Sequence, residues 1–452
     1  MSWIDTFFKK KTIAAADARL KLGRYSDNDK EPHQYEAWKT ALQKYDAGNY
    51  IETFKNFLEY LRDDTTDNVR WQETAAGGIK FELLQGSKRI SGMANAEKFS
   101  CCSRIAHADQ LNVTYMRQLV EANYFLYYAR YALDDNNNLT IQFDTHAVDA
   151  SPYKLYAAVK EVAINADKQD DLLLDEFNTD LIALDSGSRS ELSELEKEKK
   201  YAFLGEQIKK TFSELDKGGL DVQRYPGGVA YLLLSLAYRL DFLLAPQGYM
   251  LEAFQRIERL YFDSSIRSTS QKNLTIRREF QQISDRTKEQ TESELYNTTA
   301  TFGVLPPKSH EVLVQLIDGE LKNMDWYEQN AYENVAMAVP DFIVGNALFN
   351  YTLPQPDRAF LELYFRITQA GFFRNFNTDD QLTDPDSGQL NVKNIKAEIK
   401  KIAEKYAEKY PRLQPDISVL DFKKPCLFAR SYLMMLKALD LTPKNYPISV
   451  LD

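Results

Sequence analysis

This chain of 452 residues contains few cysteines and few histidines, and it has no excess of basic residues. Three cysteines (Cys101, Cys102 and Cys426) are too few for a disulfide framework, which predicts a reducing, cytoplasmic environment. There are 56 lysines and arginines against 66 aspartates and glutamates, so the net charge is −10. Because contacts to phosphates need clustered cations, we expect no nucleic-acid partner.

The common catalytic and cofactor-binding motifs are also missing. The sequence has no His-Glu-X-X-His, Cys-X-X-Cys or Gly-X-Ser-X-Gly pattern, and its glycine pairs do not fit a phosphate-binding loop. Residues 384–388 begin like a calcium loop, but no further acid follows before Glu398, which favours an ordinary turn. The four histidines are far apart: His33, His107, His146 and His310. We therefore expect no enzyme, no metal and no cofactor.

Long hydrophobic runs are rare, and only residues 226–245 suggest a membrane span. That run contains Arg239 and Asp241, each of which costs about 2.5–3.5 kcal/mol at the centre of a bilayer. We therefore predict a buried core helix and no integral membrane segment. Residues 1–24 are predicted to form a short amphipathic helix, which either docks on the protein itself or contacts a membrane surface.

What the sequence does contain is a change of hydrophobic period. A period of two predicts strands, a period of about 3.6 predicts helices, and an Asp/Asn-rich stretch at 134–138 predicts a turn. The strands are predicted at 79–83, 90–94, 99–105, 127–133 and 139–143. Helices are predicted within 35–61, near 113–123 and from 152 to about 174. This pattern predicts an α+β fold with a five-stranded antiparallel sheet, in the order α-β-β-β-α-β-β-α.

Beyond the sheet, all of the periodic segments are helical. A Ser/Gly-rich stretch separates them from the sheet, and Pro340 is expected to kink or split one of them, at 324–350. The predicted organisation is an amphipathic segment with a linker at 1–34, an α+β domain at 35–177, a link at 178–195 and an all-helical domain at 196–452.

The first domain resembles a known family. The segments YMRQLVEANYFLYYARYALDDNNNLTIQFD at 115–144 and AAVKEVAINADKQDDLL at 157–173, together with the element order, are similar to the YbjN family and to the type III secretion chaperone-like superfamily that contains it. The resemblance covers about 100–140 residues and no catalytic residue. It implies a non-enzymatic bacterial protein that holds a protein client or partner. Since the secretion chaperones dimerise, a homodimer is also expected.

The sheet face opposite the helices is the predicted binding surface. If Tyr127, Tyr131, Leu139, Ile141 and Phe143 face the helices, side chains typical of protein interfaces remain on the other face: Tyr128, Arg130, Met93 and Leu84. The helical domain or residues 1–24 could instead cover this face. Two other functions stay open: a structural or regulatory scaffold that acts through the helical domain, and a hydrolase with a site between the domains.

Overall fold

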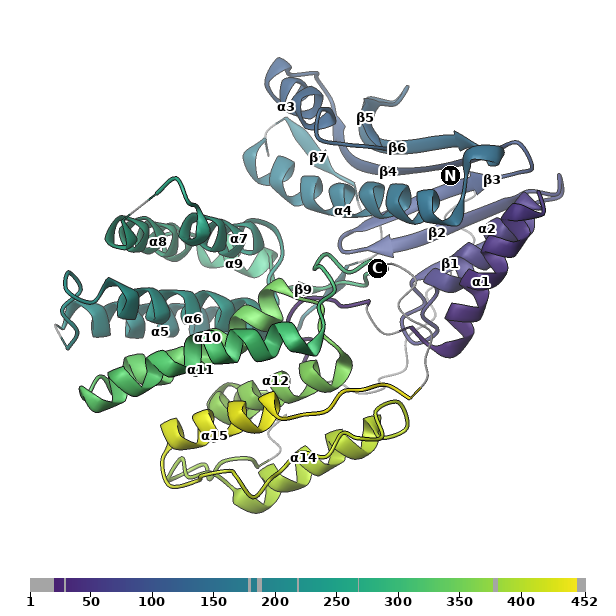
Figure 1. Ribbon diagram of the computed structural model, residues 1–452. Helices are drawn as coiled ribbons and strands as arrows, with labels where there is room; N and C mark the ends of the chain where they lie inside the picture. Colours follow the sequence, from purple (N-terminus) through teal and green to yellow (C-terminus); the bar gives the residue numbers. More distant parts are fainter. Residues whose placement is uncertain are drawn as a thin grey trace.

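A computed structural model describes residues 20–27, 30–177, 180–184, 189–217, 219–266, 268–376 and 381–444. An antiparallel sheet with its helices comes first along the chain, and a large helical region follows, as predicted (Figure 1). The helix predicted at 1–24 lies outside the described residues except for 20–24, which are not helical.

The first region begins with a helical hairpin and continues into the sheet. Side chains cap the first turns of two of its helices. Asn49 accepts a hydrogen bond from Glu52 N, and Ser151 accepts one from Lys154 N. Its helices are α1 (Pro32–Asp46), α2 (Tyr50–Leu61), α3 (Val113–Asn123) and α4 (Pro152–Glu176). Its strands are β1 (Val69–Glu73), β2 (Ile79–Gln85), β3 (Lys88–Ala94), β4 (Lys98–Ala108), β5 (Arg130–Leu133), β6 (Asn138–His146) and β7 (Leu181–Ala183).

The prediction of five strands was wrong, because the sheet has seven. They are ordered β1-β2-β3-β4-β6-β5, and β7 pairs with β4. The predicted order α-β-β-β-α-β-β-α therefore lacks a strand before β2 and another after α4, whereas the helical hairpin of α1 and α2 agrees with the helices predicted within 35–61. Both missed strands are short: β1 is the five-residue run VRWQE, and β7 has three residues. Runs of this length carry little alternation to detect.

One face of the sheet forms the core of this region, and α4 runs along it (Figure 1). Leu139, Ile141 and Phe143 are buried there, as predicted. Gly92 is also on this face, where an added Cβ would overlap the ring of its cross-strand neighbour Phe81. The aromatic ring therefore covers the glycine and fills the space of the missing side chain.

The turn between β2 and β3 fits closely against α4. Gly86 has a φ of +55°, and a Cβ at this position would overlap the carboxylate of Asp167. That carboxylate accepts a hydrogen bond from Ser87 N at 2.6 Å. Lys88 is buried beside the turn and donates to the Ile105 carbonyl at 2.7 Å. The turn thus requires glycine for its backbone conformation and for its contact with α4.

We expect Gly86→Ala to lower the free energy of unfolding by about 1–3 kcal/mol, because it adds a steric clash to left-handed backbone strain. Gly77→Ala is the matched control, since Gly77 has a φ of +77° but open space around its Cβ position. Denaturant unfolding of the two variants should show the larger loss for Gly86→Ala. Equal losses would mean that the contact with Asp167 contributes nothing.

All of the long secondary-structure elements in the second region are helices. Within the described residues beyond 200, the one strand is β9 (Tyr296–Asn297), which pairs with β8 (Ser190–Glu191). The helix predicted at 324–350 is split before Glu333, where Ala331 has a positive φ, and α11 continues through Pro340. The helices are α5 (Glu194–Asp216), α6 (Pro226–Leu244), α7 (Gly248–Phe262), α8 (Thr269–Ser284), α9 (Lys288–Ser293), α10 (His310–Gln329), α11 (Glu333–Asn350), α12 (Gln355–Thr368), α13 (Ala370–Asn375), α14 (Val392–Tyr406) and α15 (Pro425–Lys437).

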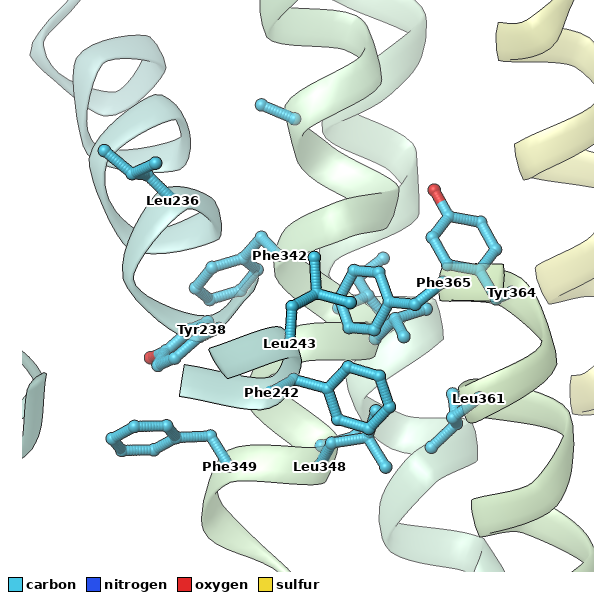
Figure 2. Close-up of a cluster of buried hydrophobic side chains, with 14 of the residues drawn as sticks. Leu236, Tyr238, Phe242, Leu243, Phe342, Leu348, Phe349, Leu361, Tyr364 and Phe365 are labelled. Atoms are coloured by element: carbon cyan, nitrogen blue, oxygen red, sulfur yellow. The ribbon is translucent and has the colours of Figure 1, made fainter. Parts of the chain in front are cut away.

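Helix α6 lies at the centre of the helical core. Figure 2 shows Tyr238 and Phe242 of α6 beside aromatic residues of α11 and α12, and the rings of Phe242 and Phe365 are 5.1 Å apart. By length and composition α6 is the one helix in the described part of the chain that could cross a membrane. However, 78% of its apolar stretch is buried inside the protein. Its two charges are paired: Arg239 with Asp341 at 3.1 Å, and Asp241 with Arg24.

Residues 20–27, which we call the N-terminal strap, connect the two regions. Gly23 N donates to the Phe242 carbonyl at 2.7 Å, and the Arg24 guanidinium binds both carboxylate oxygens of Asp241. At its other end the strap reaches α4, where Asp27 accepts a hydrogen bond from the Tyr156 hydroxyl at 3.2 Å. The strap therefore contacts the core of each region.

A second connection runs in the opposite direction, from the helical region into the sheet. Residues 299–303 lie against the end of β2, where the Gln85 side chain accepts from Thr301 N and Phe302 N at 3.1 and 2.9 Å. The Phe302 side chain is fully buried in the core of the sheet region, 5.5 Å from the Tyr156 ring. The sheet thus completes its core with a residue from the helical half of the chain.

Candidate functional site

The outer face of the sheet, opposite α4, carries a hollow of about 520 Å³. Every residue that lines it belongs to β1–β6, so the hollow crosses most of the sheet. On its floor Ser91, Ser100, Cys102 and Gln142 supply small or polar side chains, and Met93 supplies an apolar one that is 56% exposed. Burial raises the pKa of the Cys102 thiol, which keeps this group neutral. The floor can therefore contact both apolar and polar groups.

Three charged side chains define one end of the hollow. Asp144 on β6 accepts from Arg130 on β5 and forms an ion pair with Lys98 on β4 at 2.9 Å. The hydrogen bonds from Arg130 and then Lys98 hold the pKa of Asp144 below its usual value. The carboxylate thus stays ionised and holds both cations at the rim.

The opposite end of the hollow is also charged. Burial raises the pKa of Glu82 on β2, although the positive charges of Arg89 and Arg70 oppose this effect, and Arg89 lies 3.5 Å from the carboxylate. Arg70 and Lys80 line the hollow at this end. Counting both ends, four cations and two carboxylates line the hollow, so it is net positive within a chain whose net charge is −10.

Two of the four predicted binding residues line this hollow, and two do not. Met93 and Arg130 are lining residues. Tyr128 is 41% exposed and does not line the hollow, because its ring lies 6.4 Å from that of Phe143, whose side chain belongs to the core on the other face. Leu84 is only half-buried but lies away from the hollow, where its carbonyl accepts a hydrogen bond from the Thr301 hydroxyl at 2.7 Å.

The prediction that Tyr127 faces the helices was wrong, because this side chain is 91% exposed. The strand begins only at Arg130, and the three preceding amides, of residues 127–129, all donate to the Glu161 carboxylate of α4 at 2.7–2.8 Å. Asn123 also binds both backbone groups of Tyr131. These contacts replace strand pairing, so the alternation of side chains does not extend back to Tyr127.

Sequence reasoning missed the charged rim of the hollow. Asp144 follows Gln142 by two residues in the same strand, so extending the alternation by one step would have placed it on the outer face. Arg70 was missed because β1 was not predicted as a strand. Lys80 and Glu82 lie within the strand predicted at 79–83, and Lys98 directly precedes the one predicted at 99–105, but no sequence signal indicates that the three gather at two ends of one hollow.

Elsewhere, in the helical region, a histidine and a carboxylate form a buried pair. His310 Nδ1 lies 2.8 Å from Asp357 Oδ1, and both side chains are buried.

Among the residues that the structure describes, no group of three or more His, Cys, Asp or Glu side chains could hold a metal ion. Asp384 instead accepts hydrogen bonds from Asp386 N and Ser387 N, which is the turn predicted for residues 384–388.

The stability of the protein should depend on pH through the buried pair of His310 and Asp357. Burial alone would lower the pKa of His310, but the hydrogen bond and charge of Asp357 outweigh it and raise the pKa overall. The stabilisation is therefore present below the usual histidine pKa of about 6.5 and is lost as the pH rises through the raised value. We expect His310→Gln to lower the melting temperature clearly at about pH 6 and much less at about pH 9. A difference that stays constant over this range would contradict a charged pair.

No protein-family model matches the chain, and no curated protein matches it significantly. The resemblance to the YbjN family thus stays a prediction that rests on residues 115–144 and 157–173.

Proposed function

We propose that the protein is a non-enzymatic binding protein, chaperone-like or an adaptor, that holds an extended segment of another protein in the hollow of its sheet. The observation that carries this proposal is the hollow itself. Its size is that of a site for a few side chains or a small ligand, and it extends across the strands from β1 to β5. A sheet face that only meets water would need neither a concave shape nor exposed Met93.

The chemistry of the hollow indicates what kind of segment fits. Met93 offers an adaptable apolar contact, and the serine and glutamine side chains of the floor can hydrogen-bond a backbone. The net positive rim attracts acidic side chains. A carboxylate of the partner can replace Asp144 as the group that binds Arg130 and Lys98. We therefore favour a partner segment that combines apolar and acidic residues.

A photo-crosslinking experiment in the native cell tests this proposal. The crosslinking amino acid p-benzoylphenylalanine replaces Met93 in the hollow, and in a control chain it replaces Leu274, which is 59% exposed on α8. We expect a defined protein adduct from position 93 that is absent from position 274. The same adducts from both positions, or none from position 93, would contradict the proposal.

Charge reversal should then reduce the adduct selectively. Arg130→Glu leaves Asp144 facing a like charge and reverses one end of the rim, so we expect at least a tenfold weaker adduct from position 93, the effect of about 1.4 kcal/mol. Arg412→Glu is the matched control, because Arg412 is an exposed arginine 3.6 Å from Asp440, outside the hollow. Equal adduct from both variants would remove the rim from the binding site.

The helical region offers a basis for the scaffold alternative. A groove of about 680 Å³ lies along α5 and is closed by α8 and α9. The exposed Ala202 and Gly205 and the half-buried Phe212 line it, so a partner segment could approach α5 closely there. A crosslinker in place of Tyr201, which also lines the groove, distinguishes this alternative from binding at Met93.

A further inference from the structure

The side chains on the floor and at the ends of the hollow form two parallel rows that cross the sheet. Strand pairing places one residue of each strand beside a residue of the next, so each row runs perpendicular to the strands. The first row is Arg70, Glu82, Ser91, Cys102, Gln142 and Arg130, and the second row is Gln72, Lys80, Met93, Ser100 and Asp144. Every member of both rows lines the hollow, so its long axis also crosses the strands.

Both rows are charged towards their ends and neutral in the middle. In the first row the members on β3, β4 and β6 are a serine, a cysteine and a glutamine, and the charged members lie on the strands to either side. In the second row a methionine and a serine lie between Lys80 and Asp144. A ligand that matches this pattern has a neutral or apolar middle and a charge at each end.

The arginines at the two ends of the first row are held by carboxylates of the chain itself. Arg70 forms an ion pair with Asp67, and Arg130 forms one with Asp144. All four side chains are between 33% and 51% exposed, and ion pairs that face water contribute little to stability. A carboxylate of a partner can therefore replace the internal one at a small cost, so each end suits one acidic side chain.

The strand order fixes the distance between these two ends. Arg70 on β1 and Arg130 on β5 are separated by five strand intervals, which at about 4.8 Å each gives about 24 Å. An extended chain advances about 3.3 Å per residue, so it needs about seven residues to join the two ends. Met93 on β3 lies two intervals from β1 and three from β5, which places it about three residues from one end and about four from the other.

We propose that the hollow takes an extended segment that lies across the strands and carries two acidic residues about seven positions apart, with an apolar residue between them. This inference rests on the proposed function, to which it adds the direction and the charge spacing of the bound segment. A segment parallel to the strands would reach only one charged end, and a segment paired with an edge strand would lie beside the rows rather than over them.

Two synthetic peptides of the same composition test the spacing. Both have ten residues with blocked termini, two central leucines, two glutamates and serine elsewhere. The glutamates are at the second and ninth positions of the first peptide and at the fourth and seventh positions of the second. We expect the first peptide to bind the full chain at least about tenfold more tightly in a calorimetric titration, because only its acids reach both arginines. Equal binding of the two peptides, or binding of neither, overturns the spacing.

Charge reversal at each end identifies the two contacts. Arg70→Glu and Arg130→Glu should each weaken binding of the first peptide about tenfold, and the double variant about 100-fold, because the two ends are too far apart to interact. Arg412→Glu, outside the hollow, should change nothing. A peptide with lysine in place of one glutamate should regain affinity for Arg130→Glu, which separates a lost contact from a folding defect. Unchanged binding by either single variant, or no rescue by lysine at either position, overturns the proposal.

The adduct formed by a crosslinker at position 93 gives an independent result. After digestion, mass spectrometry identifies the residue of the partner that is joined to the hollow. We expect an acidic residue about three positions from it on one side and about four on the other. A segment without an acid on both sides overturns the spacing but leaves the proposed function standing, whereas the absence of any adduct overturns both.

Discussion

Arg24→Ala is expected to lower the free energy of unfolding by about 3–5 kcal/mol, the cost of breaking a buried ion pair from one side. The side chains of Arg24 and Asp241 are only 9% and 4% exposed, and the guanidinium also lies 3.7 Å from the centre of the Phe349 ring. Without Arg24, the Asp241 carboxylate is left buried among apolar side chains of α6. Chemical denaturation of the wild type and the variant measures the loss.

The matched control for this prediction removes both charges. Arg24→Met with Asp241→Leu keeps the bulk of the two side chains and leaves no charge behind, so the double variant should recover most of the loss. If Arg24→Ala lowers the free energy of unfolding by less than about 1 kcal/mol, as is typical of exposed ion pairs, the Arg24–Asp241 pair is accessible to solvent.

Phe302→Ala is expected to cost about 3–5 kcal/mol, because it removes a fully buried aromatic side chain and leaves a cavity. The cavity would lie in the core of the sheet region, next to Tyr156. Residue 302 belongs to the helical half of the chain, so the loss should appear in probes of both regions. Hydrogen exchange of the amides of β2 and α4 measures this effect in the sheet.

Phe262→Ala is the control for this second prediction. Phe262 is 55% exposed on α7, and its truncation should change stability by no more than about 0.5 kcal/mol. If Phe302→Ala has an equally small effect, the loop at 299–303 does not contribute to the core of the sheet region.

Much of the fold could be predicted because its main signals are local. Amphipathic stripes and an Asp/Asn turn predicted α3, β6 and α4 close to their observed bounds. The break between α10 and α11 was misplaced because proline is the strongest visible helix breaker, whereas the actual break depends on Ala331, whose positive φ has no sequence signature. Residues 20–24 form no helix, and Gly23 and Arg24 bind Phe242 and Asp241 of α6 instead, which lie more than 200 positions away in the sequence.

The candidate site could be predicted only in part, for a similar reason. Alternation within β3 and β5 placed Met93 and Arg130 on the outer face, and both line the hollow. Leu84 was misjudged because residues 299–303 lie against that end of β2. Tyr127 was misjudged because the Glu161 carboxylate, rather than a neighbouring strand, binds its amide. Such long-range contacts leave no trace in the period of a short segment.

The partners of the strap and of the 299–303 loop have a consequence for synthesis on the ribosome. Arg24 is separated from Asp241 by 217 residues, and Gln85 is separated from Phe302 by the same number. At about 5–20 residues per second, each of these early residues emerges about 10–40 s before its partner is translated. The sheet region therefore cannot complete its core while it is being made. During that interval the nascent chain exposes the apolar core site next to Tyr156 that Phe302 fills only after the helical half has been made.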